Sequence, residues 1–290
     1  MDKQPNYEFT GTPLLRLRDA GKPIVYVVHH PLSADRDVTS RESSGFASLL
    51  WQLRYWPLVR GQRAFCTSGV NVLSVSQTVA RRLIDEGAPA SSITVVPNGV
   101  DGEVFTPGDL AASEFDVIAL GSFMHPRKGF RYVREAYKKL AAKGLRIADV
   151  GRRSEAQHAE LRNIPQVRSF GTVEHDQLLA LLRSSSTLMS TSLYEGFGLS
   201  LIEALACGRP AFAFDAGATG EVLQSIDPTL VVPVRDVSAL VTRVESFLAL
   251  PTEERVAKGQ RYRSEVLARY SLKHSADALL ALYKRARKAP

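Results

Sequence analysis

From residue 115 onward, short apolar runs alternate regularly with longer amphipathic stretches, and this alternation constrains the fold more than any other feature of the chain. The apolar runs predict strands, and the stretches between them have helical spacing. Strands that alternate with helices favour a parallel sheet covered on both faces. We therefore predict an α/β, doubly wound, Rossmann-like fold. The predicted strands lie near 116–121, 146–150, 167–171, 187–191, 211–215 and 230–234, and the helices near 129–143, 154–162, 175–184, 199–207, 219–225 and 236–249.

The first part of the chain has fewer elements of this kind. Three strands are predicted near 22–28, 71–75 and 93–96, with a helix near 77–86. Turn-forming residues over 104–113 predict a linker, and residues 252–288 predict two further helices. We expect a partial N-terminal Rossmann-like domain over 1–108, a complete one over 109–270, and a helix over 271–290 that packs back on the first domain.

Composition excludes several classes of protein. No apolar run is long enough to suggest a membrane span, and the polar N-terminus lacks a signal-peptide core, so we expect a cytoplasmic protein. Cys66 and Cys207 are the two cysteines and lie far apart, which argues against a zinc site. The net charge of +7 attracts polyanions, but charge alone does not indicate nucleic acid. The basic run 284–288 is interpreted as a solvated helix end, with contact at the inner membrane surface as the alternative.

The densest motif is EGFGLSLIEALACGRP, residues 195–210, which follows a predicted strand and opens a helix. Gly196 and Gly198 allow a tight turn and close approach to a ligand. The N–H groups at the start of the helix, near Leu199, form an anion site. Glu195 and Glu203 are expected to face one crevice at the carboxyl ends of the strands, where they can accept hydrogen bonds from sugar hydroxyls.

A purely structural interpretation of Glu203 is also open. The segment SLIE, residues 200–203, matches a capping box in which the glutamate closes back on the helix start. Gly208 would then end the helix, and Pro210 would prevent its continuation. This interpretation does not account for Glu195, the two glycines or Phe197.

The motif over 195–210 resembles the donor-site signature of retaining glycosyltransferases of the GT-B fold, family 4. Segments 95–101 (VVPNGVD), 121–129 (GSFMHPRKG) and 213–220 resemble further parts of that family. The resemblance implies two Rossmann-like domains and a nucleoside-diphosphate sugar as the donor substrate, with no separate cofactor and no metal. It implies that Glu195 contacts the donor sugar and Glu203 the ribose, and that the backbone over 196–199 (Gly196, Phe197, Gly198, Leu199) lies near the phosphates.

The segment 121–129 departs from the family pattern in one respect. Ser122 stands where family members often carry arginine, and the loop is one residue longer than usual. Lys128 fits the usual diphosphate-binding lysine, and Arg127 is a candidate replacement for the missing charge, since two cations suit a diphosphate leaving group. An exposed pair of cations before a helix is the alternative. Val173 follows a predicted strand where the family's backbone meets the nucleobase.

His29 and His30 end the first predicted strand, where family members often place one histidine that faces the donor sugar. His29 matches better by its distance from Pro23, and His30 is the alternative. An ordinary turn histidine is equally compatible with the pattern. A metal site that includes Asp35 and Asp37 is a weaker interpretation.

Together these features predict a hexosyltransferase with Glu195, Lys128 and His29 as its catalytic residues. The family's first glycine-rich loop is not found, and two or three strand–helix units are missing from the N-terminal domain. The alternatives are therefore a nucleotide-sugar-binding protein without turnover, or a subunit completed by a partner chain. An epimerase is disfavoured by the two glutamates, and a dehydrogenase by the absence of a G-x-G-x-x-G motif. The acceptor, whether glycan, lipid or small molecule, is not indicated.

Overall fold

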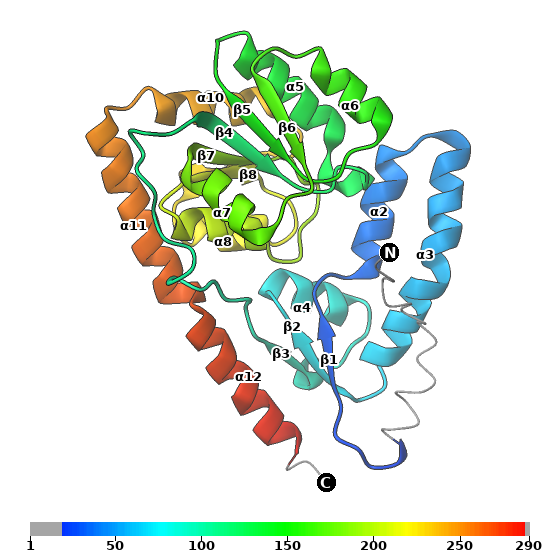
Figure 1. Ribbon diagram of the computed structural model, residues 1–290. Coiled ribbons are helices and arrows are strands. Elements are labelled where there is room, and N and C mark those ends of the chain that lie inside the picture. Colours follow the sequence, from blue (N-terminus) through cyan, green and yellow to red (C-terminus); the bar gives the residue numbers. More distant parts are fainter. Residues whose placement is uncertain (1–18, 288–290) are drawn as a thin grey trace. The chain divides into compact units, whose positions relative to one another are not determined.

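The computed structural model describes residues 19–287, which form two compact units (Figure 1). One unit is a continuous segment, Asn98–Ser275. The other combines the described residues up to Pro97 with those from Ala276 onward. The chain thus passes between the units after residues 97 and 275, whereas the sequence placed the boundaries after 108 and 270.

The unit over 98–275 is built on a parallel sheet of six strands in the order β6-β5-β4-β7-β8-β9. Every predicted strand of this region is present. The central strands are buried on both faces: Val117, Ile118 and Ala119 are fully inaccessible, as expected for a sheet covered by helices on either side. The strands are β4 (Phe115–Leu120), β5 (Ile147–Val150), β6 (Val167–Gly171), β7 (Ser185–Ser190), β8 (Ala211–Phe214) and β9 (Val231–Val232).

The described part of this unit contains seven helices after these strands. For the six helices whose two ends were predicted, each end lies within two residues of the prediction. Connections between parallel strands are almost always right-handed. With the strand order found here, this rule places the helices before β5 and β6 on one face of the sheet and those before β8 and β9 on the other. Helix α10 packs beside α5, and α11 packs beside α8. The helices are α5 (Phe130–Ala141), α6 (Glu155–Arg162), α7 (His175–Arg183), α8 (Leu199–Ala206), α9 (Thr219–Gln224), α10 (Val237–Leu248) and α11 (Thr252–Tyr270).

The strand order places a switch point at the centre of this sheet. From β4 the chain first builds β5 and β6 on one side, then returns to build β7, β8 and β9 on the other. The loops after β4 and β7 therefore diverge at the carboxyl ends of neighbouring strands, and open α/β sheets bind ligands in the crevice formed there. These two loops contain the predicted segment 121–129 and the beginning of the motif over 195–210.

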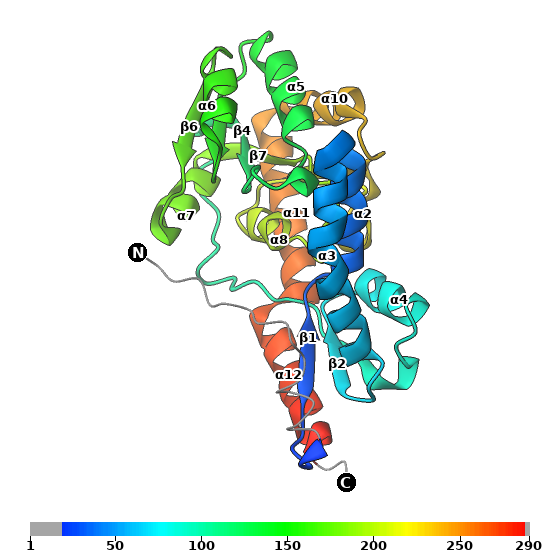
Figure 2. The same cartoon turned by 90° about the vertical axis from the view of Figure 1, so that its right-hand side faces the viewer.

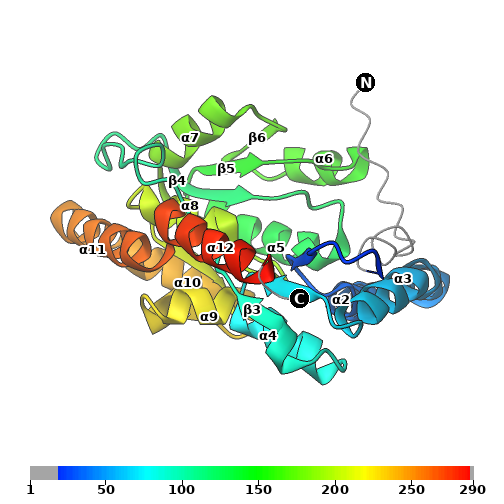
Figure 3. The same ribbon diagram turned by 90° about the horizontal axis from the view of Figure 1, so that it is seen from below.

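The other unit has a smaller parallel sheet in the order β1-β2-β3, which comprises Val25–Val28, Asn71–Ser74 and Ile93–Val95. Helix α4 (Gln77–Asp85) joins β2 to β3, as predicted. Two helices between β1 and β2 were not predicted: α2 (Leu32–Glu42) and α3 (Gly45–Cys66), which lie side by side (Figure 2). Figure 3 shows α12 (Leu272–Ala286) directly after α11, so both C-terminal helices are confirmed.

The predicted linker over 104–113 is held to the larger unit by arginine side chains. Arg183 donates to the carbonyl oxygens of Thr106, at 3.1 Å, and Val104, at 3.0 Å. Arg209, almost fully buried, donates to the Gly108 carbonyl at 2.9 Å. Because these carbonyls have partners within Asn98–Ser275, the segment belongs to this unit despite its loop-like composition.

Candidate functional site

The loop after β4 ends in a single turn of 3-10 helix, Pro126–Lys128, followed by Gly129. The Nδ1 atom of His125 accepts a hydrogen bond from the Arg127 N–H, at 3.3 Å, and so caps this turn. Gly129 has φ +70°, and a Cβ atom there would collide with the carbonyl oxygen of Thr191. Only glycine allows this approach, which brings the β4 loop against the chain that leaves β7.

Further hydrogen bonds join the two loops. The Leu193 N–H donates to the Arg127 carbonyl at 2.7 Å. The Thr191 hydroxyl donates to the Lys128 and Gly129 carbonyls, each at 3.3 Å. The backbone positions of Arg127 and Lys128 are therefore fixed relative to the loop that carries Glu195.

Glu195 is the centre of a charged cluster at the switch point, beyond the carboxyl ends of β4 and β7. Its Oε1 atom lies 2.5 Å from the Lys128 Nζ, and its Oε2 atom lies 3.4 Å from an Arg127 Nη atom. The same guanidinium nitrogen donates to the Tyr194 carbonyl at 3.2 Å. All three charged side chains are at most one-fifth exposed. The structure thus brings together three of the predicted site residues from two loops.

The charges of this cluster control the ionisation of Glu195. Burial alone would raise the pKa of its carboxyl group, but the positive charges of Lys128 and Arg127 and the hydrogen bond from Lys128 outweigh burial and lower that pKa. Glu195 is therefore a carboxylate at neutral pH. Two cations that converge on one anion can also bind a second anion, such as a diphosphate.

The backbone of Glu195 is held from a third loop, the one after β8. The Ala218 N–H donates to the Glu195 carbonyl at 2.8 Å. Gly217 has φ +63°, and a Cβ atom there would meet that same carbonyl oxygen. The predicted glycine segment over 213–220 thus supports the site by close backbone contact.

Helix α8 begins one residue after Gly198, whose φ of +96° requires glycine. No side chain caps this helix, and Ser200 is its second residue, so the capping-box interpretation of Ser200 and Glu203 is wrong. The Leu201 and Ile202 N–H groups donate to the Gly198 carbonyl, at 3.0 and 3.4 Å. The Leu199 and Ser200 amides precede these first bonds of the helix and can bind an anion. At the other end, Gly208 terminates α8 as predicted, with φ +70°.

The side chains of Phe197 and Leu199 differ in exposure: the first is buried and the second is exposed. The Phe197 ring is buried, with its centre 5.4 Å from that of Tyr270 in an edge-on arrangement. Its side chain therefore belongs to the core, so a ligand would meet Phe197 through its backbone. The Leu199 side chain is exposed.

Glu203 is half-buried on α8, and the described interactions do not join it to the Glu195 cluster. Burial raises the pKa of its carboxyl group, and the charge of His175 opposes that rise. His175 is the first residue of α7, two residues after the half-buried Val173. His175 was not among the predicted site residues.

Arg153 was also missed. It is buried after β5 and donates to the Gly121 carbonyl at 2.5 Å, and it is paired with the buried Asp149. Its guanidinium carbon lies 4.1 Å from the centre of the Phe123 ring. Arg153 thus fixes the first half of the loop that presents Arg127 and Lys128. No motif over 121–129 indicated a partner so far along the chain.

The two histidines after β1 belong to the other unit. His30 Nε2 lies 2.8 Å from an oxygen of the buried Asp35, whereas His29 is exposed. Partial burial and the neighbouring charge of His30 lower the pKa of His29. His30 is thus paired within its own unit, and His29 is the more exposed of the two histidines.

The weaker metal-site interpretation of Asp35 and Asp37 does not hold for the described residues. Asp37 is paired with Arg36, at 2.7 Å, and with Arg82, at 2.8 Å. Within residues 19–287, no three His, Cys, Asp or Glu side chains are grouped as a metal ion would require. No helix in that range is both long enough and apolar enough to cross a membrane.

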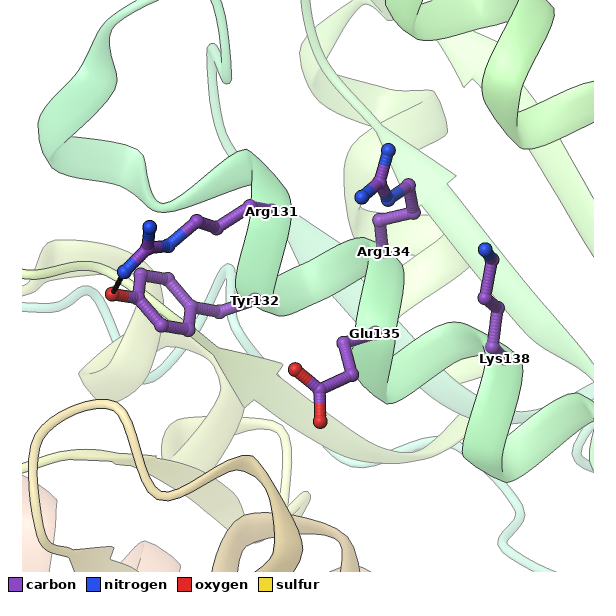
Figure 4. A pocket seen from close by; sticks show the side chains of 5 residues that line it. All are labelled: Arg131, Tyr132, Arg134, Glu135 and Lys138. Atoms are coloured by element: carbon purple, nitrogen blue, oxygen red, sulfur yellow. Dashed lines mark hydrogen bonds between the residues drawn. The ribbon is translucent and has the colours of Figure 1, made fainter. Parts of the chain in front are cut away.

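A hollow of about 350 Å³ lies on α5 (Figure 4). Figure 4 shows the Arg131 guanidinium at the Tyr132 hydroxyl, which also accepts from Arg235 at 2.9 Å. None of the predicted site residues lines this hollow. Its lining residues are Arg131, Tyr132, Arg134, Glu135 and Lys138.

The sequence of this chain is similar to those of known proteins. The family described as "Glycosyl transferases group 1" matches residues 114–249, and "Glycosyltransferase Family 4" matches residues 6–104. An MMP alpha-(1->4)-mannosyltransferase of Mycolicibacterium hassiacum is 30% identical over 95% of this chain, which spans 68% of that protein. The D-inositol 3-phosphate glycosyltransferase of Mycobacterium bovis is also 30% identical, over 71% of this chain, but the match spans only 47% of its length.

Solved structures share the fold at lower sequence identity. A sucrose-phosphate synthase from Thermosynechococcus elongatus superposes with a TM-score of 0.77 at 21% identity, over 97% of this chain and 72% of its own. Anabaena HepE, determined in complex with UDP and glucose, superposes with a TM-score of 0.71 at 17% identity, over 94% and 74% of the two chains. The predicted GT-B architecture with two Rossmann-like domains is thus confirmed.

Proposed function

Because the chain belongs to glycosyltransferase family 4, the glycosyl transferases group 1, we propose that it transfers a hexose from a nucleoside-diphosphate sugar to an acceptor hydroxyl with retention of configuration. The observation that carries the proposal is the convergence of Lys128 and Arg127 on Glu195 at the switch point. A sugar nucleotide presents a dianionic diphosphate next to neutral hydroxyl groups, and this cluster offers cations next to a carboxylate.

In the proposed reaction, the bond between the anomeric carbon and the diphosphate oxygen breaks, and the acceptor oxygen bonds to that carbon on the same face. Lys128 and Arg127 stabilise the negative charge that develops on the leaving diphosphate, as does the N-terminus of α8 near Gly198. Two cations and a helix terminus meet the need for positive charge without a metal ion. The acceptor proton leaves with the diphosphate product or with solvent.

The carboxylates have separate roles in this proposal. Glu195 accepts hydrogen bonds from donor sugar hydroxyls, and its low pKa keeps it ionised for that purpose. Glu203 accepts hydrogen bonds from the ribose hydroxyls, with Val173 near the base. His29 acts near the reacting carbon by the family resemblance. The donor diphosphate competes with Glu195 for its two cations, so donor binding weakens these ion pairs.

A thermal-shift titration with UDP, GDP, ADP and their common sugar conjugates tests donor binding and identifies the base. A ligand that binds only the folded protein raises its Tm. Stabilisation by one nucleotide, followed by hydrolysis of its sugar conjugate or transfer to an acceptor, is the expected result. No shift with any nucleotide, from a cooperatively folded sample, would contradict the proposal.

Three variants separate the proposed roles. Lys128→Ala should weaken nucleoside-diphosphate binding by roughly tenfold or more, because a charged hydrogen bond is worth about 1.5–3 kcal/mol. Lys138→Ala, which removes an equivalent charge beside the α5 hollow, is the matched control and should bind normally. Glu195→Gln should abolish transfer but retain or tighten nucleotide binding, because it leaves both cations uncompensated. Wild-type turnover by Glu195→Gln would refute the role of this carboxylate.

A further inference from the structure

Helix α3 carries a row of large apolar side chains that are exposed. Each is between 49% and 73% exposed, whereas large apolar side chains of a soluble helix usually point into a core. We refer to these residues as the α3 stripe. Its members are Phe46, Leu49, Leu50, Leu53 and Trp56.

The spacing of the stripe places it on one side of the helix. Successive members are three, one, three and three residues apart, which keeps them on adjacent positions of one helical face. The opposite side of α3 packs inward, where Tyr55, Phe65 and Cys66 are buried. The stripe is therefore additional to the face that α3 uses to join its own unit.

The charges on α3 are all of one sign. Its 22 residues contain no aspartate or glutamate, and its charged residues are Arg54, Arg60 and Arg63. Two of these guanidinium groups lie over indole rings: Arg54 is 5.4 Å from the centre of the Trp51 ring, and Arg60 is 5.6 Å from that of Trp56. Leucine, phenylalanine and tryptophan beside arginine are typical of helices that lie in the interface of an anionic membrane.

We propose that the α3 stripe binds to the surface of a lipid bilayer that contains anionic phospholipids, with the helix in the plane of that surface. The apolar side chains enter the boundary between headgroups and acyl chains, and the arginines contact lipid phosphates. A second copy of the chain would also cover the stripe, but it would bring the same arginines together in a chain whose net charge is already +7. Charge complementarity therefore favours the anionic surface.

This contact differs from the one suggested by the basic run over 284–288. That run ends α12, where the exposed large apolar side chains near it are Leu280 and Tyr283, against the five of the α3 stripe. Its last residue, Lys288, lies outside the described residues. The α3 stripe combines charge with apolar area, and both are needed for stable attachment at the interface. Replacement of Lys284 and Arg285 by glutamine should leave most of the binding intact.

Intrinsic fluorescence provides a direct test, because the chain has two tryptophans, Trp51 and Trp56, and both are on α3. The whole chain is titrated with vesicles of phosphatidylcholine mixed with phosphatidylglycerol, and in parallel with vesicles of phosphatidylcholine alone. We expect a blue shift of the emission and co-sedimentation with the mixed vesicles, and weaker binding to the neutral ones.

Variants of exposed residues keep the fold intact and show which surface binds. Leu53→Glu should lower the coefficient for partition into the mixed vesicles by roughly tenfold or more, because it puts a charge where an apolar side chain would enter the bilayer. Val256→Glu, at an exposed apolar position on α11, is the matched control and should bind like the wild type. Arg54→Gln and Arg60→Gln should each weaken binding to the anionic vesicles by roughly fivefold, with little effect on the neutral ones.

Two results would overturn the proposal. One is wild-type vesicle binding by both Leu53→Glu and the milder Leu53→Gln, with an unchanged Tm to show that both variants are folded. The other is a blue shift that grows with protein concentration in the absence of vesicles and coincides with dimers in analytical ultracentrifugation. That second result would identify another copy of the chain as the partner of the α3 stripe.

Discussion

At the residue scale, the buried carboxylate of Glu195 depends on two cations, Arg127 and Lys128, that lie almost 70 residues earlier in the chain. These cations outweigh the cost of burying a carboxylate, which would otherwise raise its pKa. Sequence reasoning identified all three residues by resemblance, but it did not predict that they pair with one another. Their pairing depends on Gly129, Thr191 and Leu193, whose contacts only the folded loops show.

The lowered pKa of Glu195 gives a prediction about stability and pH. A carboxyl group whose folded pKa lies below its ordinary value, 4.5, stabilises the fold above that value and loses this contribution as pH falls through the folded pKa. We expect the stability advantage of the wild type over Glu195→Gln to be constant above about pH 5 and to shrink on acidification. Denaturant unfolding at several pH values measures it. An advantage that grows toward acid would contradict the ion-pair assignment.

Gly217 gives a second prediction, with Gly144 as its matched control. Both have positive φ, but a Cβ atom at Gly144 meets nothing within 4 Å, whereas one at Gly217 collides with the Glu195 carbonyl oxygen. Gly144→Ala should cost about 1–2 kcal/mol for the left-handed backbone alone. Gly217→Ala should cost at least about 3 kcal/mol and also impair nucleotide binding. Equal costs in chemical denaturation would show that the close backbone contact is unimportant.

At the element scale, the sequence indicated the strands and helices of the larger unit with small errors because burial and periodicity agree there. It failed over α2 and α3. Helix α2 is mostly polar, and α3 exposes the apolar side chains that would normally mark a buried face and contains Pro57. The apolar pattern of α3 therefore conflicts with the assumption that apolar residues point inward.

At the helix starts, one prediction also differed from the structure. The start of α8 depends on the backbone of Gly198 rather than on the hydroxyl of Ser200. In α4, by contrast, Ser76 is the N-cap, and its hydroxyl accepts from the Val79 N–H at 3.1 Å. The residue type alone could not distinguish these two serines, because both precede an apolar helical run.

This difference is measurable. Ser76→Ala should lower the free energy of unfolding by about 1 kcal/mol through loss of the cap. Ser200→Ala should change it by no more than about 0.5 kcal/mol, because no capping bond is lost. Thermal or urea unfolding of both variants checks the pair. A loss at Ser200 equal to that at Ser76 would restore the capping-box interpretation.

At the scale of the whole molecule, the first unit contains residues from both ends of the described chain. We predicted a boundary after residue 108, whereas residues 98–108 belong to the larger unit. Arginines far along the chain, such as Arg183 and Arg209, hold this segment there, and no local composition reveals such partners.

The discontinuous first unit predicts a long-range effect of substitutions in α12. Leu282 is buried and belongs to this unit, whereas Leu280, two residues away, is 54% exposed. Leu282→Ala should destabilise the unit by about 2–5 kcal/mol. Leu280→Ala should change its stability by about 0.5 kcal/mol or less. Tryptophan fluorescence, which reports on α3 in the same unit, follows the unfolding. Equal transitions for both variants would show that α12 does not stabilise this unit.

The same discontinuity has a consequence for synthesis on the ribosome. Domains usually fold in the order in which they emerge, beginning at the N-terminus. Here the larger unit is complete once Ser275 has left the exit tunnel, whereas the first unit still lacks the part of α12 that begins at Ala276. The larger unit is therefore expected to mature first. The first unit can complete its fold only after the end of the chain has been synthesised, although β1, β2, β3 and α3 are made early. We expect chaperones to bind these early segments, including the apolar α3 stripe, in that interval.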